Sequence, residues 1–313
     1  MVREFLPKML IRAAVIAVSS LVLLSNCNEP FGPVGPPPTY WLTVSCSPPA
    51  GGTINSASSL SMWIRAGTPV NISVSTNSGY TFSGWTLTSG TATFGNANSA
   101  NTTVTLSSNA TIMANFQIVI VSGSFTDSRD DRNYRTVQIG SQTWMAENLN
   151  YNASGSACYN NVPDSCAKYG RLYNWATVMN GASSSTSSPS RVQGVCPEGW
   201  HVPSDAEWTA LTNFVGSSAG NKLKSTTGWT YYSASTVGTD DYGFSALPGG
   251  IGSSGGSFDN AGYSGYWWSA TEYGASYAWG RNMGCRNDYV GRHDNDKTGL
   301  YSVRCFRDFA APQ

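Results

Sequence analysis

Between residues 40 and 118, apolar and polar residues alternate in short runs. The clearest runs lie at residues 42–44, 70–74, 102–106 and 110–116, with glycine, proline or asparagine between them. Successive side chains of a strand point to opposite faces of its sheet, so this alternation places one face of each strand against a core. The pattern predicts a small, mostly β module of antiparallel strands over residues 40–118.

The second part of the chain, residues 119–313 with a core at 125–309, carries strand patterns in separate runs. Val137 and Ile139 alternate before the Gly140-Ser141 turn, which predicts a hairpin. Three more strands are expected near the carboxyl end, where aromatic and β-branched residues gather. These runs lie at residues 266–271, 277–283 and 301–307.

Two helices are predicted in this second part. Ser204 and Glu207 form a capping box, in which the serine hydroxyl accepts from the third helical N–H and the carboxylate accepts from the cap N–H. From Trp208 onward, apolar residues recur at helical spacing. Another helix is expected over residues 169–179, whereas residues 226–265 are rich in glycine, serine and threonine and are expected to be irregular. The expected fold class is α+β.

The first 26 residues have the pattern of an export signal. Arg3, Lys8 and Arg12 precede an apolar run over residues 13–24. This run is too short to span a bilayer and has the length of the apolar region of a signal peptide. Residues 1–26 are therefore predicted to be removed during export.

The sequence Leu24-Ser25-Asn26-Cys27 resembles the lipobox of bacterial lipoproteins, although Asn26 departs from the usual small residue before the cysteine. The resemblance implies cleavage before Cys27 and lipidation of its thiol. Residues 27–39 are rich in proline and glycine and form an extended tether. We expect an outward-facing outer-membrane lipoprotein held in the membrane by this lipid; the alternative is an ordinary secretory signal and a secreted protein.

Composition excludes one class of partner. Charged residues make up 12% of the chain and the formal net charge is zero, whereas typical soluble domains contain about 25% charged residues. No cluster of basic residues is present. Because nucleic-acid binding depends on neutralising phosphates, we do not expect a nucleic-acid partner.

The cysteines indicate disulfides more than metal binding. Of the seven present, six remain if Cys27 is acylated, and six allow fifteen pairings. Cys158 and Cys166 bracket a polar loop, which favours a local disulfide. Only two histidines and no CxxC pair are present, so we expect no metal site and no cofactor.

A second disulfide is expected between Cys196 and Cys305, which enclose the most aromatic part of the chain. Cys196 precedes the capped helix and Cys305 lies in the last predicted strand. Cys285 could replace either partner. Cys46 lies in the first module, so these last two are the candidates for free thiols.

Five motifs follow one another in the second part of the chain. They are WMAENLNY (144–151), YGRLYNWA (169–176), CPEGWHVPSD (196–205), WWSAT (267–271) and VRC (303–305). Together they resemble the Fibrobacter succinogenes major paralogous domain of bacterial surface and secreted proteins. The resemblance implies a C-type-lectin-like fold, which sugar binders, adhesins and formylglycine-generating enzymes share. The role of the family is undefined, and the fold does not determine a function.

The first module has a resemblance of its own. Residues 48–53, 79–85 and 114–116 are similar to the bacterial repeat related to internalin B-repeats. This resemblance implies a β-grasp-like spacer or adhesion module. Trp85 is expected in the core, because its repeat position pairs with Phe116.

The favoured hypothesis is a non-catalytic surface protein that binds a polysaccharide or a surface protein in adhesion. Loops held on a rigid scaffold commonly carry binding residues, and aromatic rings can stack on sugars. The candidate ligand-binding residues are Trp229, Tyr231, Tyr232 and Tyr263. Four tryptophans at motif or strand positions are expected in the core instead, namely Trp200, Trp208, Trp267 and Trp279.

Two alternatives stay open, a surface enzyme (glycan-active or related to formylglycine-generating enzymes) and a purely structural envelope protein. Glycoside hydrolysis needs two carboxylates about 5–10 Å apart, yet Asp205 and Glu207 belong to the start of a helix. No residue is assigned as catalytic. Residues 288–296 could offer oxygens to calcium, but we interpret them as an acidic turn between strands. His201 and His293 are interpreted as ordinary residues.

Overall fold

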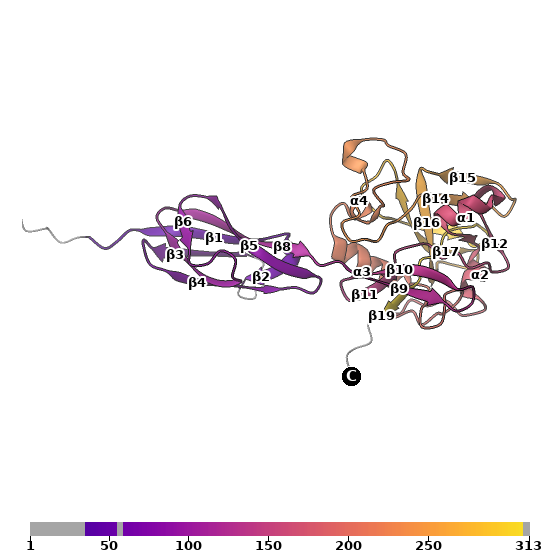
Figure 1. Ribbon diagram of the computed structural model, residues 1–313, viewed down its shortest axis with the longest axis horizontal. Coiled ribbons are helices and arrows are strands. Elements are labelled where there is room, and N and C mark those ends of the chain that lie inside the picture. Colours follow the sequence, from indigo (N-terminus) through magenta and orange to yellow (C-terminus); the bar gives the residue numbers. More distant parts are fainter. Residues whose placement is uncertain (1–34, 55–58, 309–313) are drawn as a thin grey trace, which may run out of the picture. The chain divides into compact units, whose positions relative to one another are not determined.

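The computed structural model describes residues 35–54 and 59–308 (Figure 1). Contacts divide the chain into residues 1–38 and residues 39–313. The predicted signal peptide and Cys27 lie outside the described residues. Within the described ranges, no helix has the length and apolar character needed to cross a bilayer.

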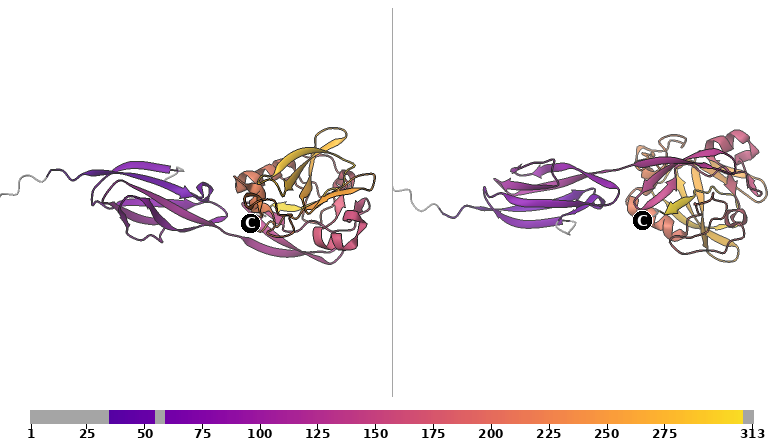
Figure 2. Two further views of the ribbon diagram at one scale, coloured as in Figure 1. Left: turned by 90° about the horizontal axis from the view of Figure 1, so that it is seen from above. Right: turned by 60° about the horizontal axis from the view of Figure 1, so that its bottom comes forward.

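Residues 39–118 form the N-terminal module, which consists of two four-stranded sheets (Figure 2). Its strands are β1 (Thr39–Ser47), β2 (Gly52–Ile54), β3 (Ser59–Arg65), β4 (Val70–Thr76), β5 (Tyr80–Ser89), β6 (Ala92–Phe94), β7 (Asn101–Leu106) and β8 (Ala110–Ile118), with a 3-10 helix at Pro49–Gly51. One sheet has the order β3-β1-β8-β5 and the other has the order β2-β4-β7-β6.

The apolar faces of both sheets contribute to one core. Leu42 of β1 and Ile112 of β8 are fully buried in it, and Ile72 of β4 is almost so. Trp85 and Phe116 are buried in the same core, as expected. The alternation along each strand thus produces the apolar face that the sequence predicted.

The β-grasp-like expectation for this module is corrected. No α-helix occurs among residues 39–54 and 59–118, and a second sheet takes the place that a helix would have against the first. The reason is that all the longer strands alternate and therefore offer apolar faces to each other. β1 and β8 pair in parallel, whereas only antiparallel pairs were expected.

Residues 121–308 form the C-terminal domain, an α+β structure of short strands and four α-helices among the described residues. Its strands are β9 (Val121–Asp127), β10 (Arg132–Ile139), β11 (Gln142–Met145), β12 (Ser156–Ala157), β13 (Leu172–Tyr173), β14 (Gly249–Gly252), β15 (Phe258–Ala261), β16 (Ser264–Glu272), β17 (Tyr277–Gly284), β18 (Gly291–Asp296) and β19 (Phe306–Asp308). Its helices are α1 (Pro163–Tyr169), α2 (Trp175–Met179), α3 (Asp205–Val215) and α4 (Ala219–Leu223), with 3-10 helices at Tyr159–Asn161 and Ala234–Thr236.

Two larger sheets organise this domain. One has the order β19-β11-β10-β9, and the other has the order β15-β14-β16-β17-β18. Strands β12 and β13 form a separate pair. Within the domain, α1 and α2 lie at the opposite end from α3 and α4 (Figure 1).

The predicted helix over residues 169–179 is confirmed only for Trp175–Met179, which form α2, and the described residues contain four α-helices where two were expected. α1 ends at Tyr169 because Gly170 takes a left-handed φ of 76°. The chain then forms β13, and Asn174 starts α2 by accepting a hydrogen bond from the Thr177 amide at 2.9 Å. Local backbone signals at these two positions thus divide one apolar run into three elements.

The capped helix is confirmed. The Ser204 hydroxyl accepts from the Glu207 amide at 3.2 Å, and the Glu207 carboxylate accepts from the Ser204 amide at 2.8 Å. The irregular region expected at residues 226–265 is confirmed for residues 226–248, apart from the 3-10 helix, and is wrong beyond them, since β14 and β15 lie there. The acidic turn expected at residues 288–296 is likewise mostly strand β18. These short strands form because neighbouring strands satisfy their backbone groups.

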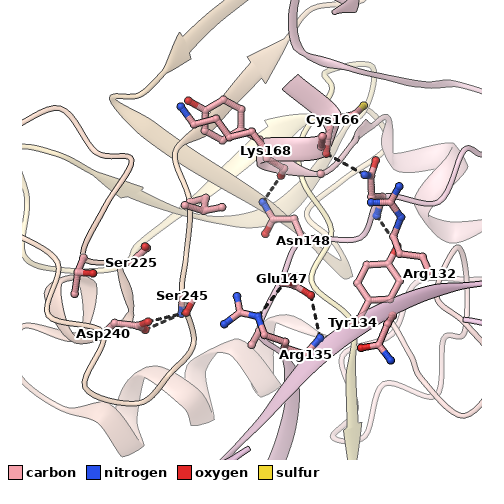
Figure 3. Close-up of a pocket in the computed structure, with 18 residues that line it drawn as sticks. Arg132, Tyr134, Arg135, Glu147, Asn148, Cys166, Lys168, Ser225, Asp240 and Ser245 are labelled. Carbon is pink, nitrogen blue, oxygen red and sulfur yellow. Dashed lines mark hydrogen bonds and ion pairs between the residues drawn. The ribbon is translucent and has the colours of Figure 1, made fainter. Parts of the chain in front are cut away.

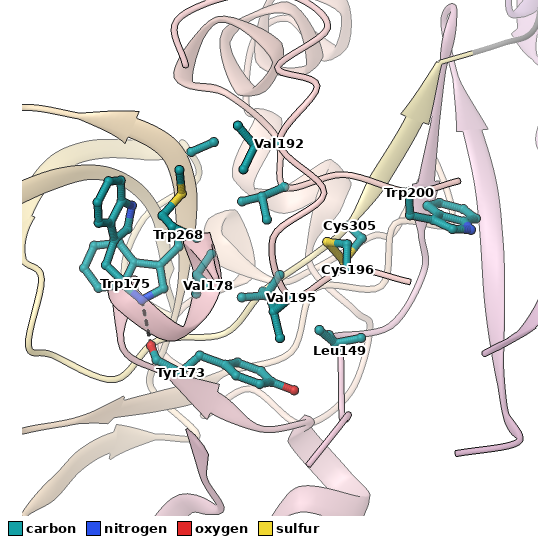
Figure 4. Close-up of a cluster of buried hydrophobic side chains, with 14 of the residues drawn as sticks. Leu149, Tyr173, Trp175, Val178, Val192, Val195, Cys196, Trp200, Trp268 and Cys305 are labelled. Carbon is teal, nitrogen blue, oxygen red and sulfur yellow. Dashed lines mark hydrogen bonds between the residues drawn. A yellow bond between two sulfur atoms is a disulfide. The ribbon is translucent and has the colours of Figure 1, made fainter. Parts of the chain in front are cut away.

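Two disulfides stabilise the C-terminal domain. Cys158 is joined to Cys166 and Cys196 to Cys305, the pairs expected from the sequence. The second bridge lies in the core beside Val195 and Leu149 (Figure 4). Trp200, Trp208 and Trp267 are buried as predicted, whereas Trp279 is only partly buried. Cys46 and Cys285 are buried free thiols.

Candidate functional site

Three of the four aromatic residues predicted to contact a ligand are exposed. Tyr231 is 72% exposed, Tyr232 58% and Tyr263 52%. The Thr230 amide donates to the Gly262 carbonyl at 2.7 Å, which holds the loop of the first two tyrosines against the turn between β15 and β16. The structure therefore brings the three tyrosines to one region of the surface.

Trp229 has a different position. Its indole N–H donates to the Ala246 carbonyl at 3.0 Å, and its ring packs against the core while the Lys224 ammonium lies 5.4 Å from the ring centroid. A ring held in this way covers the core. Of the four candidate residues, only the three tyrosines therefore form an exposed aromatic surface.

A pocket of about 310 Å³ opens beside Tyr263, and we call it the tyrosine pocket. It is lined by Asn260, Tyr263, Ser264, Asn282, Gly284, Cys285, Arg286 and Asn287. β16 and β17 pair at Ser264 and Gly284, and the Cys285 amide donates to the Tyr263 carbonyl at 2.8 Å. Pairing between strands thus joins a turn before β16 to the segment after β17.

Lys224 holds one wall of the tyrosine pocket. Its buried ammonium donates to the carbonyls of Gly284 at 3.2 Å, Asn287 at 2.8 Å and Thr236 at 2.6 Å. Burial lowers the pKa of Lys224 to about 8. The ends of the segment 284–287 are therefore held by one cation, and the loop at Thr236 is tied to them.

The polar side chains of the pocket are largely unpaired. The side-chain amides of Asn260 and Asn287 form no hydrogen bond within the described part of the chain. The Oδ1 atom of Asn282 is buried against Gly291 and has no partner among the described residues. The Arg286 guanidinium lies 5.2 Å from the centroid of the Tyr232 ring. The partly exposed amides of Asn260 and Asn287 and the exposed Arg286 guanidinium are thus available to a ligand, while the buried Asn282 Oδ1 is an exception to the rule that buried polar atoms are hydrogen-bonded.

A second cavity, the polar cleft, has a volume of about 450 Å³ and lies between β10, α1 and the loop before β14 (Figure 3). Two carboxylates line it. Glu147 lies 3.2 Å from Arg135, and Asp240 accepts from the Ser245 amide at 2.7 Å and from its hydroxyl at 2.6 Å. Burial raises the pKa of Asp240. Both carboxylates therefore already have partners inside the domain.

The carboxylates at the start of α3 are also engaged. Asp205 pairs with Arg281, and with Arg292 at 2.9 Å. Glu207 is fully buried and, besides its part in the capping box, accepts from the Ser190 amide at 3.2 Å. Within residues 35–54 and 59–308, no cluster of three or more His, Cys, Asp or Glu side chains could hold a metal ion.

The N-terminal module carries an exposed aromatic pair of its own. Trp41 of β1 and Trp63 of the edge strand β3 are directly paired on neighbouring strands, with ring centroids 5.1 Å apart. Trp63 is 64% exposed. The pair offers aromatic surface for stacking on an exposed strand edge.

Sequence patterns identified the tyrosines and missed the groups that accompany them. Arg286, Asn282 and Asn287 were not singled out, because a polar residue at a strand end has no distinctive spacing. One available signal was the rarity of charge in this chain, which makes an arginine beside the unassigned Cys285 unusual. The grouping itself depends on the pairing of β16 with β17.

Two family models match the chain. The Fibrobacter succinogenes major domain matches residues 137–307, and the divergent InlB B-repeat domain matches residues 42–120. No curated protein and no solved structure matches. The two matched domains, together with the two disulfides, indicate a surface-associated or secreted protein.

Proposed function

The chain belongs to the Fibrobacter succinogenes major domain family, and from this premise we propose that it is a non-catalytic surface protein that binds glycans. The observation that carries the proposal is the tyrosine pocket, where exposed rings lie beside unpaired amides. A protein ligand is the second possibility for the same surface, because tyrosine-rich surfaces also bind proteins.

The chemistry of a sugar suits this surface. A pyranose ring has an apolar C–H face, which an exposed tyrosine can cover, and an edge of hydroxyls, which amide side chains can pair with. Tyrosine provides this contact area at low conformational cost, because it has only two side-chain torsions. The pocket of about 310 Å³ lies at the lower end of the usual range of about 300–1,000 Å³ for small-molecule sites.

The proposal of a non-catalytic role is supported by the state of the carboxylates. Glu147, Asp205, Glu207 and Asp240 each have an arginine, amide or hydroxyl partner within the domain. Hydrolysis would need one of two facing carboxylates to be free to act on a substrate. Release of product from any glycan at a rate lost in Asp240→Asn or Glu147→Gln would contradict this part of the proposal.

The test of binding uses the full chain on a panel of polysaccharides. Tyr232→Ala and Tyr263→Ala should each weaken the affinity for a bound glycan by about tenfold, as removal of an aromatic contact residue commonly does. Tyr273→Ala is the matched control, because Tyr273 is as exposed as Tyr232 but neither lines the pocket, as Tyr263 does, nor contacts Arg286, as Tyr232 does. The proposal fails if no polysaccharide binds, or if all three variants bind equally well.

We also propose that the C-terminal domain has a C-type-lectin-like fold and that Cys27 anchors the protein to the outer membrane. The lipobox-like sequence ending at Cys27 and the proline-rich tether after it support the anchor. Cells fed labelled palmitate should label the protein, and Cys27→Ala should abolish the label. Cys46→Ala is the control. Label that persists in Cys27→Ala would refute the anchor.

A further inference from the structure

We propose that the tyrosine pocket selects acidic sugars, and that Arg286 binds the carboxylate of a uronic acid residue. The inference rests on the proposed glycan-binding function and adds the class of ligand to it. Its starting observation is the charge of the pocket. Arg286 is the only cationic side chain of the pocket lining, and no Asp or Glu belongs to the lining.

Arg286 has no acidic partner in the described part of the chain, unlike four of the other arginines there. Arg129 pairs with Asp127 at 2.7 Å, and Arg281 and Arg292 both pair with Asp205. Arg286 is exposed and contacts the Tyr232 ring. In a chain where only 12% of residues are charged, an arginine left unpaired beside a pocket supplies positive charge that an anionic ligand can neutralise.

The guanidinium suits a carboxylate. Its planar N–H groups match the two oxygens of a carboxylate in a bidentate pair, which is stronger and more directional than a neutral hydrogen bond. The contact with the Tyr232 ring holds the Arg286 guanidinium near the pocket, and its N–H groups have no acceptor in the described part of the chain. The same ring adds contact area for a sugar bound next to the guanidinium.

The other side chains suit the hydroxyls of the same sugar unit. Asn260 and Asn287 present amides that can both donate and accept, and Ser264 adds a hydroxyl. A uronic acid is a pyranose with one carboxylate and several hydroxyls. One arginine surrounded by amides therefore matches it better than it matches a fully neutral hexose or a bare anion.

The wall that carries Arg286 is held in place before a ligand arrives. Lys224 donates to the carbonyls of Gly284 and Asn287, which flank Cys285 and Arg286 in sequence. A site whose backbone is fixed in advance loses less entropy on binding. The buried Lys224 ammonium thus helps to position Arg286.

The ligand class is tested with pairs of oligosaccharides. The two members of a pair have the same stereochemistry and differ only in the carboxylate. Uronic acid oligosaccharides of galacto, gluco and manno configuration are titrated calorimetrically into the full chain, each beside its neutral hexose counterpart. At least one uronate should bind about tenfold more tightly than its neutral counterpart, because an arginine–carboxylate pair adds a charge-assisted interaction. Its affinity should fall as salt concentration rises.

Three variants locate the effect. Arg286→Gln should abolish the preference for the uronate over its neutral counterpart. Arg286→Lys should restore only part of the preference, because an ammonium cannot form the bidentate pair. Arg65→Gln removes the same charge from an exposed position of β3 and should change nothing.

A fourth variant tests the pocket without changing its charge. A Cβ at Gly284 would lie 3.6 Å from the Asn287 amide nitrogen and 3.8 Å from the Ser264 hydroxyl, which are ordinary contacts. Gly284→Ala therefore narrows the pocket without backbone strain and should weaken binding of the uronate and of its neutral counterpart alike. Gly274→Ala, at a position with open space around it, is the control.

The outcomes separate this inference from the proposed function. Equal affinity for every uronate and its neutral counterpart overturns the acidic-sugar inference and leaves glycan binding intact. Tight binding of sulfated oligosaccharides with none of uronates also overturns it. A preference for uronates that survives in Arg286→Gln, or binding unchanged in Gly284→Ala, shows that another site is responsible. Failure to bind any oligosaccharide removes both proposals.

Discussion

The disulfide between Cys196 and Cys305 should contribute more to the stability of the C-terminal domain than the Cys158–Cys166 disulfide does. It closes a loop with a sequence separation of 109 residues. In the chain-entropy model, a loop of this length restricts the unfolded chain by about 4.8 kcal/mol at 25 °C. The Cys158–Cys166 bridge closes a separation of only 8 residues, for which the same relation gives about 2.5 kcal/mol.

The perturbation is replacement of each pair by alanine in the full chain. Alanine is preferred to serine because Cys196 and Cys305 are fully buried, where a serine hydroxyl would lack a hydrogen-bond partner. We expect Cys196→Ala with Cys305→Ala to lower the melting temperature of the C-terminal domain by about 10–20 °C, and the other double variant by about half as much. The N-terminal module contains neither bridge and serves as an internal reference.

The assay is differential scanning calorimetry supported by urea unfolding, which gives the loss in free energy directly. The quantity that tests the argument is the difference between the two double variants, about 2.3 kcal/mol from the loop lengths. Equal losses, or a larger loss from removal of the short bridge, would refute the loop-closure reasoning. The stability would then come from local packing around each cystine.

Two further predictions concern buried side chains. Trp208 is fully buried and its indole N–H donates to the Trp268 carbonyl at 3.3 Å, so Trp208→Ala should cost about 3–5 kcal/mol in urea unfolding. The exposed Trp63→Ala should cost less than about 0.5 kcal/mol, and similar losses would contradict the burial argument. Burial lowers the pKa of Lys224 to about 8, which is below its usual value. As the pH rises, the folded chain therefore loses this proton at a lower pH than the unfolded chain does. Between pH 8 and about 10.4 the unfolded chain then binds more protons, and the unfolding free energy of wild type relative to Lys224→Met should rise with pH. A constant difference across that window would show that burial does not shift this group.

Local patterns predicted the elements whose stabilising contacts are themselves local. The capping box at Ser204 and Glu207 depends on residues three positions apart, and it forms as expected. The hairpin of β10 and β11 follows from the alternation at Val137 and Ile139 and from Gly140, whose φ is 62°. Alternation over residues 40–118 likewise determined which side chains are buried in the N-terminal module.

Local patterns failed where competing or distant contacts decide the outcome. Residues 169–179 have an apolar content that suits a helix, yet Gly170 and Asn174 divide them. β14 and β15 have few apolar residues to mark them as strands, and they form because β14 pairs with β15 and with β16. The N-terminal module likewise has a second sheet in place of a helix, because the apolar faces of its two sheets pack against each other.

The sequence by itself indicated the class of the fold, the two families, the two disulfide pairs and three exposed tyrosines, but it misplaced Trp229, whose ring packs against the core. Only the tertiary structure decided which polar groups accompany the tyrosines. Arg286, Asn282 and Ser264 become neighbours because β16 pairs with β17 and because Lys224 binds the carbonyls at both ends of the following segment. Helix caps and strand alternation depend on residues a few positions apart, so they are visible in a sequence. A pocket is assembled by hydrogen bonds between distant segments, and its chemistry exists only once those segments are brought together.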